Sequence, residues 1–169
     1  TKGDKGVWSV DQSGDLAGTY YTYKVSVNGT TTETQDVYSK AVGVNGDRSM
    51  VIDLATTNPL CWGNDKGPEI KSQTDAIIYE ENIRDITESA DSGIKLKGKF
   101  LGLTETGTKS NEGEATGIDH LKELGVNEVH ILPSFDFSSI DETKLDLNKY
   151  NWGYDPKNYM SPEGSYATD

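Results

Sequence analysis

The stretch from Tyr150 to Pro156 combines the side-chain types that bind neutral sugars. Its sequence, YNWGYDP, places three aromatic rings, one amide and one carboxylate within seven residues. Sugar rings present apolar C–H faces and hydroxyl rims, which aromatic, Asn and Asp side chains can contact. Composition alone, however, favours a simpler interpretation, a loop held in place by buried aromatic residues.

Several acids in the same region could supply the carboxylates for general acid and base catalysis, namely Asp136, Asp141, Glu142 and Asp155. Because the chain contains 28 acids, clusters arise by chance, and each of these is more simply a loop cap, a turn residue or a solvated charge. We therefore assign no catalytic residue. There is no Gly-rich phosphate loop, Cys/His metal spacing or Gly-x-Ser-x-Gly elbow. No cofactor is expected, and a calcium requirement is left open.

Three further reactive side chains have simple structural interpretations. His130 lies in the apolar run VHIL, where a neutral imidazole with one satisfied hydrogen bond is expected. His120 should be solvated on a helix. The single cysteine, Cys61, is expected to pack as a small apolar residue.

The charge balance excludes polyanionic partners. The chain has 28 acidic and 16 basic residues, a formal charge of −12 and no basic cluster, so nucleic acids and anionic membranes should be repelled. A neutral glucan is indifferent to this charge.

The mean hydropathy of −0.65 indicates a small hydrophobic core, and no apolar run approaches the ~20 residues of a membrane span. The N-terminus has no apolar stretch of signal-peptide type, yet secreted, cell-surface and cytoplasmic locations all stay open.

The first third of the chain predicts β structure, and a small antiparallel sandwich is its natural outcome. The alternation of Tyr21, Tyr23 and Val25 with polar residues predicts a strand with one buried face, and Asn28-Gly29 predicts a hairpin turn. Trp8, Tyr20, Tyr21 and Tyr23 could include a sugar platform, but alternation requires some of them to be buried, so a core position is the preferred interpretation for any single one. The strands are expected at residues 7–10, 20–27, 31–37 and 50–54.

The second half predicts a βαβ unit. A polar segment near residues 62–76 suggests a domain junction. Residues 76–86 and 126–132 are then expected to form parallel strands, joined through a helix at 116–124 that begins at Thr116 and ends at Gly125. Residues 134–169 should form a long functional loop.

Several long, ordered segments resemble type I pullulanases, bacterial debranching enzymes of the α-amylase superfamily. In the second half these are YNWGYDP, KGKFLGLTETGT at 97–108, TGIDHLKELGVNEVHILPSFDFSSIDE at 116–142 and NYMSPEGSYATD at 158–169. Residues 6–29 and 36–62 resemble the starch-binding-type β-sandwich module that precedes the barrel in pullulanases, isoamylases and branching enzymes.

The resemblance implies a multidomain fold and two truncated ends. Residues 1–62 would be an incomplete immunoglobulin-like β-sandwich of the carbohydrate-binding type, 63–76 a linker, and 77–169 the first βαβ portion of a (β/α)8 TIM-type barrel. The family's catalytic carboxylates, on strands 4 and 5 of the barrel, would then lie beyond Asp169. Such a piece should associate with itself or with the remainder of the enzyme.

For function, the resemblance implies cleavage of α-1,6-glucosidic linkages in pullulan, starch or glycogen, with this chain inactive alone but contacting α-glucan. Tyr154 would stack on a glucose, Asp155 and Asn151 would bond its hydroxyls, and Trp152 would shape the wall of the site. Arg84 and Asp85 match a family segment in which an ion pair supports the barrel rim, but Asn82 replaces its usual His. The alternatives are a non-catalytic glucan-binding module and a fragment of an isoamylase or branching-enzyme relative.

Overall fold

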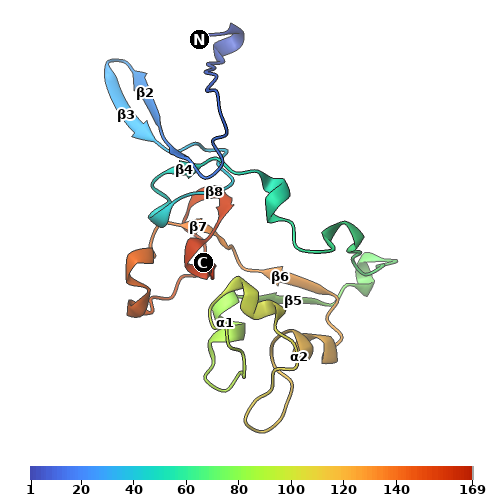
Figure 1. Cartoon of the computed structure of the whole chain (residues 1–169). Coiled ribbons are helices and arrows are strands. Elements are labelled where there is room, and N and C mark those ends of the chain that lie inside the picture. The colour runs from blue at the N-terminus through green and yellow to red at the C-terminus, as the bar shows by residue number, and fades with distance from the viewer. Residues whose placement is uncertain (169) are drawn as a thin grey trace.

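A computed structural model describes residues 1–168 as a sheet-rich chain with four two-stranded sheets and short helices (Figure 1). The two α-helices are α1 (Ile83–Glu88) and α2 (Gly117–Glu123). Short 3-10 segments complete the helical elements: η1 (Asp4–Gly6), η2 (Val44–Gly46), η3 (Leu54–Thr57), η4 (Trp62–Asn64), η5 (Gln73–Asp75), η6 (Phe100–Thr104), η7 (Glu142–Leu147) and η8 (Gly164–Tyr166). None of the helices in this described part is long and apolar enough to cross a bilayer.

The predicted hairpin is confirmed. Strands β2 (Tyr23–Val27) and β3 (Thr30–Thr34) pair antiparallel, and the turn residues Asn28 and Gly29 both have positive φ, at 50° and 81°. Two positive φ angles match the right-handed twist of the strands, which is why Asn-Gly is favoured there. Figure 1 shows this hairpin projecting away from the rest of the chain.

The predicted buried face of this first region is wrong. Every residue of β2 is exposed, and Trp8, Tyr20 and Tyr23 are exposed as well; only Tyr21 is half-buried, its hydroxyl donating to Asp36 at 2.8 Å. Alternation predicts which side chains share a face, but a face is buried only where a second layer covers it.

Two of the four predicted strands in the first region are also wrong or shortened. Residues 7–10 form only an isolated bridge between Lys2 and Trp8. At 50–54 the strand is β4 (Ser49–Met50), which pairs antiparallel with β1 (Tyr20–Tyr21) and ends well before η3. Cys61, expected to pack inside, is exposed.

The parallel pair is confirmed. Strands β5 (Ile78–Glu81) and β6 (Glu128–Ile131) run parallel, with α2 between them in sequence. Gly125, at φ 76°, ends the α2 region as expected. Thr116 precedes α2 but makes no side-chain cap, because its hydroxyl instead donates to the Ser92 carbonyl at 2.5 Å.

The first of these strands is shorter than predicted. Residues 76–86 were expected to be extended throughout, but the chain turns into α1 after Glu81. The cause is local: the side chain of Asn82 accepts a hydrogen bond from the Arg84 backbone N–H at 2.9 Å, which satisfies one free donor at the start of the helix.

The prediction of one long loop over 134–169 is wrong. Strands β7 (Phe135–Phe137) and β8 (Pro156–Pro162) pair antiparallel within this region, with register shifts around Asp136. Their sheet carries the small core of the molecule. Phe137 and Tyr166 pack edge to face at 5.7 Å, beside Ile83 of α1, and Phe100 adds a second edge-to-face contact with Tyr166 at 5.4 Å.

Residues 39–49 pack against this same sheet although they lie far away in the sequence. Ser161 donates to the Ser39 carbonyl at 2.9 Å, and Asn158 donates to the Gly46 carbonyl at 3.0 Å. The predicted division at 63–76 stays a prediction, but part of the first 62 residues is fixed to the second half.

Candidate functional site

The YNWGYDP loop lies beside the carboxyl ends of the two parallel strands. Asn82, directly after β5, donates through its side chain to the Asn151 carbonyl at 3.3 Å. At the end of β6, a Cβ on Gly153 would stand only 1.8 Å from the Pro133 carbonyl oxygen. Gly153 also has φ 88°, so both space and backbone conformation require glycine. Ligands of parallel sheets bind outside these strand ends.

Asn151 fixes the shape of this loop. It is 8% exposed, and its amide donates to the Ser139 hydroxyl at 2.6 Å and to an Asp155 oxygen at 2.8 Å. Its own oxygen accepts from the Gly153 backbone N–H at 2.6 Å. Since these bonds use both ends of the amide, Asn151 acts as the internal brace of the loop.

Asp155 is the hydrogen-bond partner of Asn151 in this loop. Burial raises the pKa of the Asp155 carboxyl, but hydrogen bonds from Asn151, Ser139 and Ser138 outweigh burial and hold the pKa below its ordinary value. The carboxylate is therefore ionised and half-buried at neutral pH, and it can accept a further hydrogen bond at its open side.

The two remaining predicted residues present exposed rings. Trp152 is 63% exposed and Tyr154 is 69% exposed, so both offer surface for stacking. Tyr150 packs edge to face against Trp152 at 5.6 Å, and its hydroxyl donates to Asp85 at 3.0 Å. The structure thus joins Asn151 to Asp155 by a hydrogen bond, while Trp152 and Tyr154 stand at the surface.

The proposed Arg84–Asp85 ion pair is wrong. Both residues lie in α1 rather than on a strand, and the Arg84 guanidinium lies 3.5 Å from Glu88. Arg84 also donates to the Lys149 carbonyl at 2.7 Å and to the Asn148 side chain. Arg84 therefore bonds residues 148–149, and Asp85 bonds Tyr150. Both contacts fix the segment where the loop begins.

The two histidines are surface residues. His120 is exposed, as expected. His130 was expected within an apolar strand, but its side chain is 65% exposed and Nδ1 lies 3.3 Å from a Glu80 oxygen.

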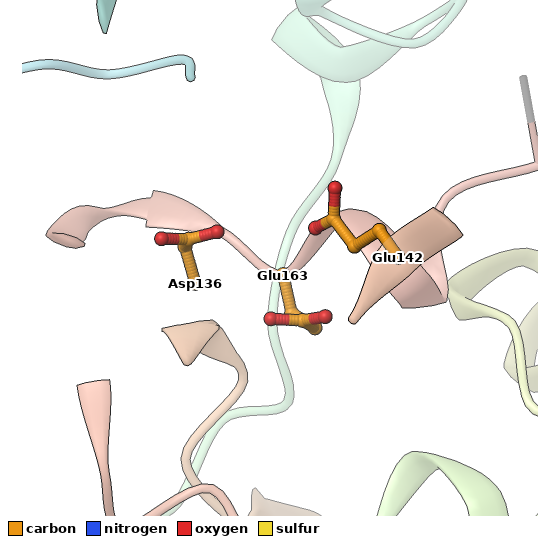
Figure 2. A group of neighbouring side chains, drawn as sticks. All are labelled: Asp136, Glu142 and Glu163. Carbon is orange, nitrogen blue, oxygen red and sulfur yellow. The ribbon is translucent and has the colours of Figure 1, made fainter. Parts of the chain in front are cut away.

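Sequence reasoning missed a second group of three carboxylates, which come from β7, the start of η7 and the residue after β8. Asp136, Glu142 and Glu163 each place one oxygen within 4.8 Å of the others, and Figure 2 shows the carboxylates facing a common space. Asp136 and Glu163 are 0% and 1% exposed, so the expectation of a solvated or turn position is wrong for Asp136. Only the fold could reveal this group, because Glu163 lies 21 or more residues further along the chain.

Burial dominates the electrostatics of this group. It raises the pKa of Asp136 despite a hydrogen bond from Asn158, and it raises the pKa of Glu163 despite hydrogen bonds from Ser165 and Phe137. Asp141, next to the group, is different: hydrogen bonds from Thr143, Lys144 and Asn45 hold its pKa well below the usual range. Asp141 caps η7, as a loop-cap interpretation expects.

Known proteins and solved structures match this chain along its whole length. No protein-family model matches it. It is 41% identical to the pullulanase of Bacillus subtilis over 169 residues, which is 100% of this chain and 23% of that protein. Its structure superposes with a TM-score of 0.97 on a variant pullulanase of Paenibacillus barengoltzii complexed with maltotriose, at 50% identity over 100% of this chain and 27% of that one.

A further solved pullulanase, from an Anoxybacillus species and complexed with maltotetraose, gives a TM-score of 0.93 at 44% identity, over 100% of this chain and 24% of that one. The chain thus spans about a quarter of the length of these relatives. From its first residue to its last, this sequence belongs to the pullulanase family.

Proposed function

We propose that this chain forms part of the α-glucan-binding surface of a debranching glycoside hydrolase, which cleaves α-1,6-glucosidic linkages in pullulan, starch or glycogen. The observation that carries the proposal is the loop 150–156, where a buried Asn151 brace presents the rings of Trp152 and Tyr154 outward. Its place at the carboxyl ends of parallel strands, and the maltooligosaccharides in complexes of two relatives, support the same conclusion.

In this proposal each loop residue has one role. Tyr154 stacks on a glucose ring, because its face is free and a phenol ring loses little conformational entropy on binding. Trp152 forms the adjoining wall, held by Tyr150. Asp155 accepts a hydrogen bond from a sugar hydroxyl, while Asn151 sets the loop geometry.

We place the catalytic carboxylates outside this chain. Retaining glycosidases need two accessible carboxyl groups ~5–5.5 Å apart. Asp136 and Glu163 are almost fully buried and Asp155 is engaged by Asn151, so these acids are poorly suited to reach a glycosidic bond. The chain alone should then leave pullulan uncut.

The proposed fold context follows from the same reasoning. The unit β5–α2–β6 would be the first βαβ portion of a (β/α)8 barrel, whose active site lies at the carboxyl ends of its strands. Residues 1–62 would belong to a carbohydrate-binding-type β-sandwich, joined through 63–76.

Titration with maltotriose and maltotetraose tests the binding role. Isothermal calorimetry would compare the wild-type chain with Tyr154→Ala and Trp152→Ala. We expect each substitution to raise the Kd about tenfold, because a central aromatic contact contributes on the order of 1–2 kcal/mol.

Trp8→Ala is the matched control, since Trp8 is an exposed aromatic residue of the other region, at 72% exposure. It should leave the Kd unchanged. Loss of binding only in Trp8→Ala would move the glucan site to residues 1–62 and favour the binding-module alternative. Release of maltotriose from pullulan by the purified chain would contradict the absence of a catalytic pair.

A further inference from the structure

The sequence contains two Asn-Gly pairs, Asn28-Gly29 and Asn45-Gly46, which the fold places in opposite environments. Neither pair belongs to the proposed glucan surface. We propose that Asn28 is a site of spontaneous deamidation, and that the contacts around Asn45 protect the second pair from the same reaction. The reaction is independent of glucan binding.

Deamidation requires a backbone nitrogen that can reach the side-chain carbonyl carbon of the preceding asparagine. The Gly29 nitrogen loses its proton to hydroxide, attacks Cγ of Asn28 and forms a new C–N bond. The bond from Cγ to Nδ2 then breaks, and the leaving group takes up a proton and departs as ammonia. Water adds to either carbonyl of the resulting succinimide and opens it to aspartate or isoaspartate. Glycine favours the attack because no Cβ obstructs the approach.

At the first pair, no contact in the described part of the chain restrains either reactant. Asn28 and Gly29 are both exposed. No hydrogen bond found within residues 1–168 involves the Asn28 side chain or the Gly29 backbone N–H. The nitrogen and the side-chain amide of this pair are therefore both available for reaction.

The turn can also leave its present conformation at small cost. Every residue of β2 is exposed, and the β2–β3 sheet has only two strands within residues 1–168. Figure 1 shows this hairpin projecting from the rest of the chain. A two-stranded hairpin without a covering layer is marginally stable, so its local opening costs little free energy. Asn28 therefore samples the conformations in which the Gly29 nitrogen reaches Cγ.

The second pair is held by hydrogen bonds on both reactants. The Asn45 side chain donates to Asp141 at 3.2 Å and accepts from the Glu142 backbone N–H at 2.7 Å, which fixes both ends of the amide. The Gly46 backbone N–H, which would have to attack, donates to the Gly43 carbonyl at 2.8 Å. Gly46 is also buried, and its carbonyl accepts two side-chain hydrogen bonds. Reaction at Asn45 therefore requires these contacts to break first.

The two products should affect the hairpin differently. Asp-Gly suits the same turn as Asn-Gly, so aspartate preserves the hairpin and adds a negative charge. Isoaspartate instead carries the backbone through the side-chain carbon, which lengthens the two-residue loop. It should therefore loosen the pairing of Val27 with Thr30, the pair nearest the turn.

The test is incubation of the purified 169-residue chain between pH 7 and pH 9, with and without urea at a concentration that unfolds it. Peptide mapping by mass spectrometry follows the exchange of NH for O at each asparagine, and protein isoaspartate methyltransferase measures isoaspartate. In the folded chain Asn28 should convert at least about tenfold faster than Asn45, a ratio that corresponds to only ~1.4 kcal/mol in the free energy of opening. The rate at Asn28 should rise with pH, because the attacking nitrogen must lose its proton.

Urea provides the internal control, because the local sequence is Asn-Gly at both positions. In the unfolded chain Asn45 should convert at a rate similar to that of Asn28. Asn28→Asp, which fixes one product in place, should show no further conversion at this position and should leave Asn45 as protected as in the wild type. Equal rates at the two positions in the folded chain, or a stable Asn28, overturn the proposal. A difference that persists in urea also overturns it, since neighbouring residues and not the fold would then control the reaction.

Discussion

At the scale of single residues, the loop separates side chains that hold a surface from those that form it. Asn151 was expected to bond a sugar hydroxyl. It is buried, however, and its amide group forms hydrogen bonds with Ser139, Asp155 and Gly153 instead. Tyr154, by contrast, is 69% exposed and forms the surface of the loop. A sequence pattern cannot distinguish these roles, because Asn and Asp serve as loop braces and as ligand contacts with the same chemistry.

Glu81 gives a prediction for pH dependence at this scale. It is 6% exposed, its Oε2 has no partner among the described residues, and burial raises the pKa of its carboxyl above 4.5. The folded chain therefore binds the proton more tightly than the unfolded chain. Stability should fall as pH rises from about 4.5 through the folded pKa, because the fold must then bury a charge.

Urea unfolding of the wild type and Glu81→Gln between pH 4 and pH 8 checks this expectation. The neutral Gln should abolish this part of the pH dependence and be the more stable variant at the upper end. Glu128→Gln, which changes an exposed glutamate at the other end of the paired strand β6, should keep the wild-type profile. A profile for Glu81→Gln that parallels the wild type would show that Glu81 contributes nothing.

At the scale of elements, Asn82 couples a helix to the loop. Its oxygen accepts from the Arg84 N–H at the start of α1, and its amide donates to the Asn151 carbonyl. Asn82→Asp keeps the capping oxygen but loses the donor, whereas Asn82→Ala loses both. We expect the Ala variant to lose about 1 kcal/mol of unfolding free energy, the usual contribution of a cap.

The two variants should separate in hydrogen exchange. Both should speed exchange of the Gly153 amide, which depends on the position of Asn151, but only Asn82→Ala should also speed exchange in α1. Equal exchange in α1 for the two variants would mean that the cap does not determine where β5 ends.

Short-range signals predicted several elements from the sequence. The Asn28-Gly29 turn, helix α2 and strand β6 depend on residues within a few positions of each other, and all three are found. The parallel pairing of β5 with β6 followed from the helix between them. Strands β7 and β8 were missed because they pair across 18 intervening residues, and the boundary of β5 was missed because a single capping residue set it.

Burial was predicted least well. Trp8 and Tyr23 have the residue types of a core, but both are exposed, because nothing within residues 1–168 covers the Lys2–Trp8 bridge or the β2–β3 hairpin. In the candidate site, residue types predicted the aromatic loop, whereas the Asp136 group depends on three segments that only the fold brings together. Patterns within one strand carry no information about a covering layer.

At the scale of the whole molecule, a small core is combined with a large exposed apolar surface. Within residues 1–168 five hydrophobic residues are buried, while Ile78, Val129 and Ile131 of the parallel pair are 65%, 45% and 38% exposed. The β5–β6 sheet has only two strands within the described chain, so its outer edges carry free backbone donors and acceptors. Such edges pair with other chains.

We therefore expect the chain in isolation to self-associate through β5 and β6, against a mutual repulsion set by its charge of −12. Because salt screens repulsion between exposed charges but leaves apolar contacts intact, the mean mass in sedimentation equilibrium should exceed 18.5 kDa and should increase from 20 mM to 300 mM NaCl. Val129→Lys, which places a charge in the strand, should restore the monomer mass. Thr31→Lys makes the same charge change on the exposed hairpin and should associate as the wild type does; if both Lys variants became monomeric, net charge and not the parallel sheet would control association.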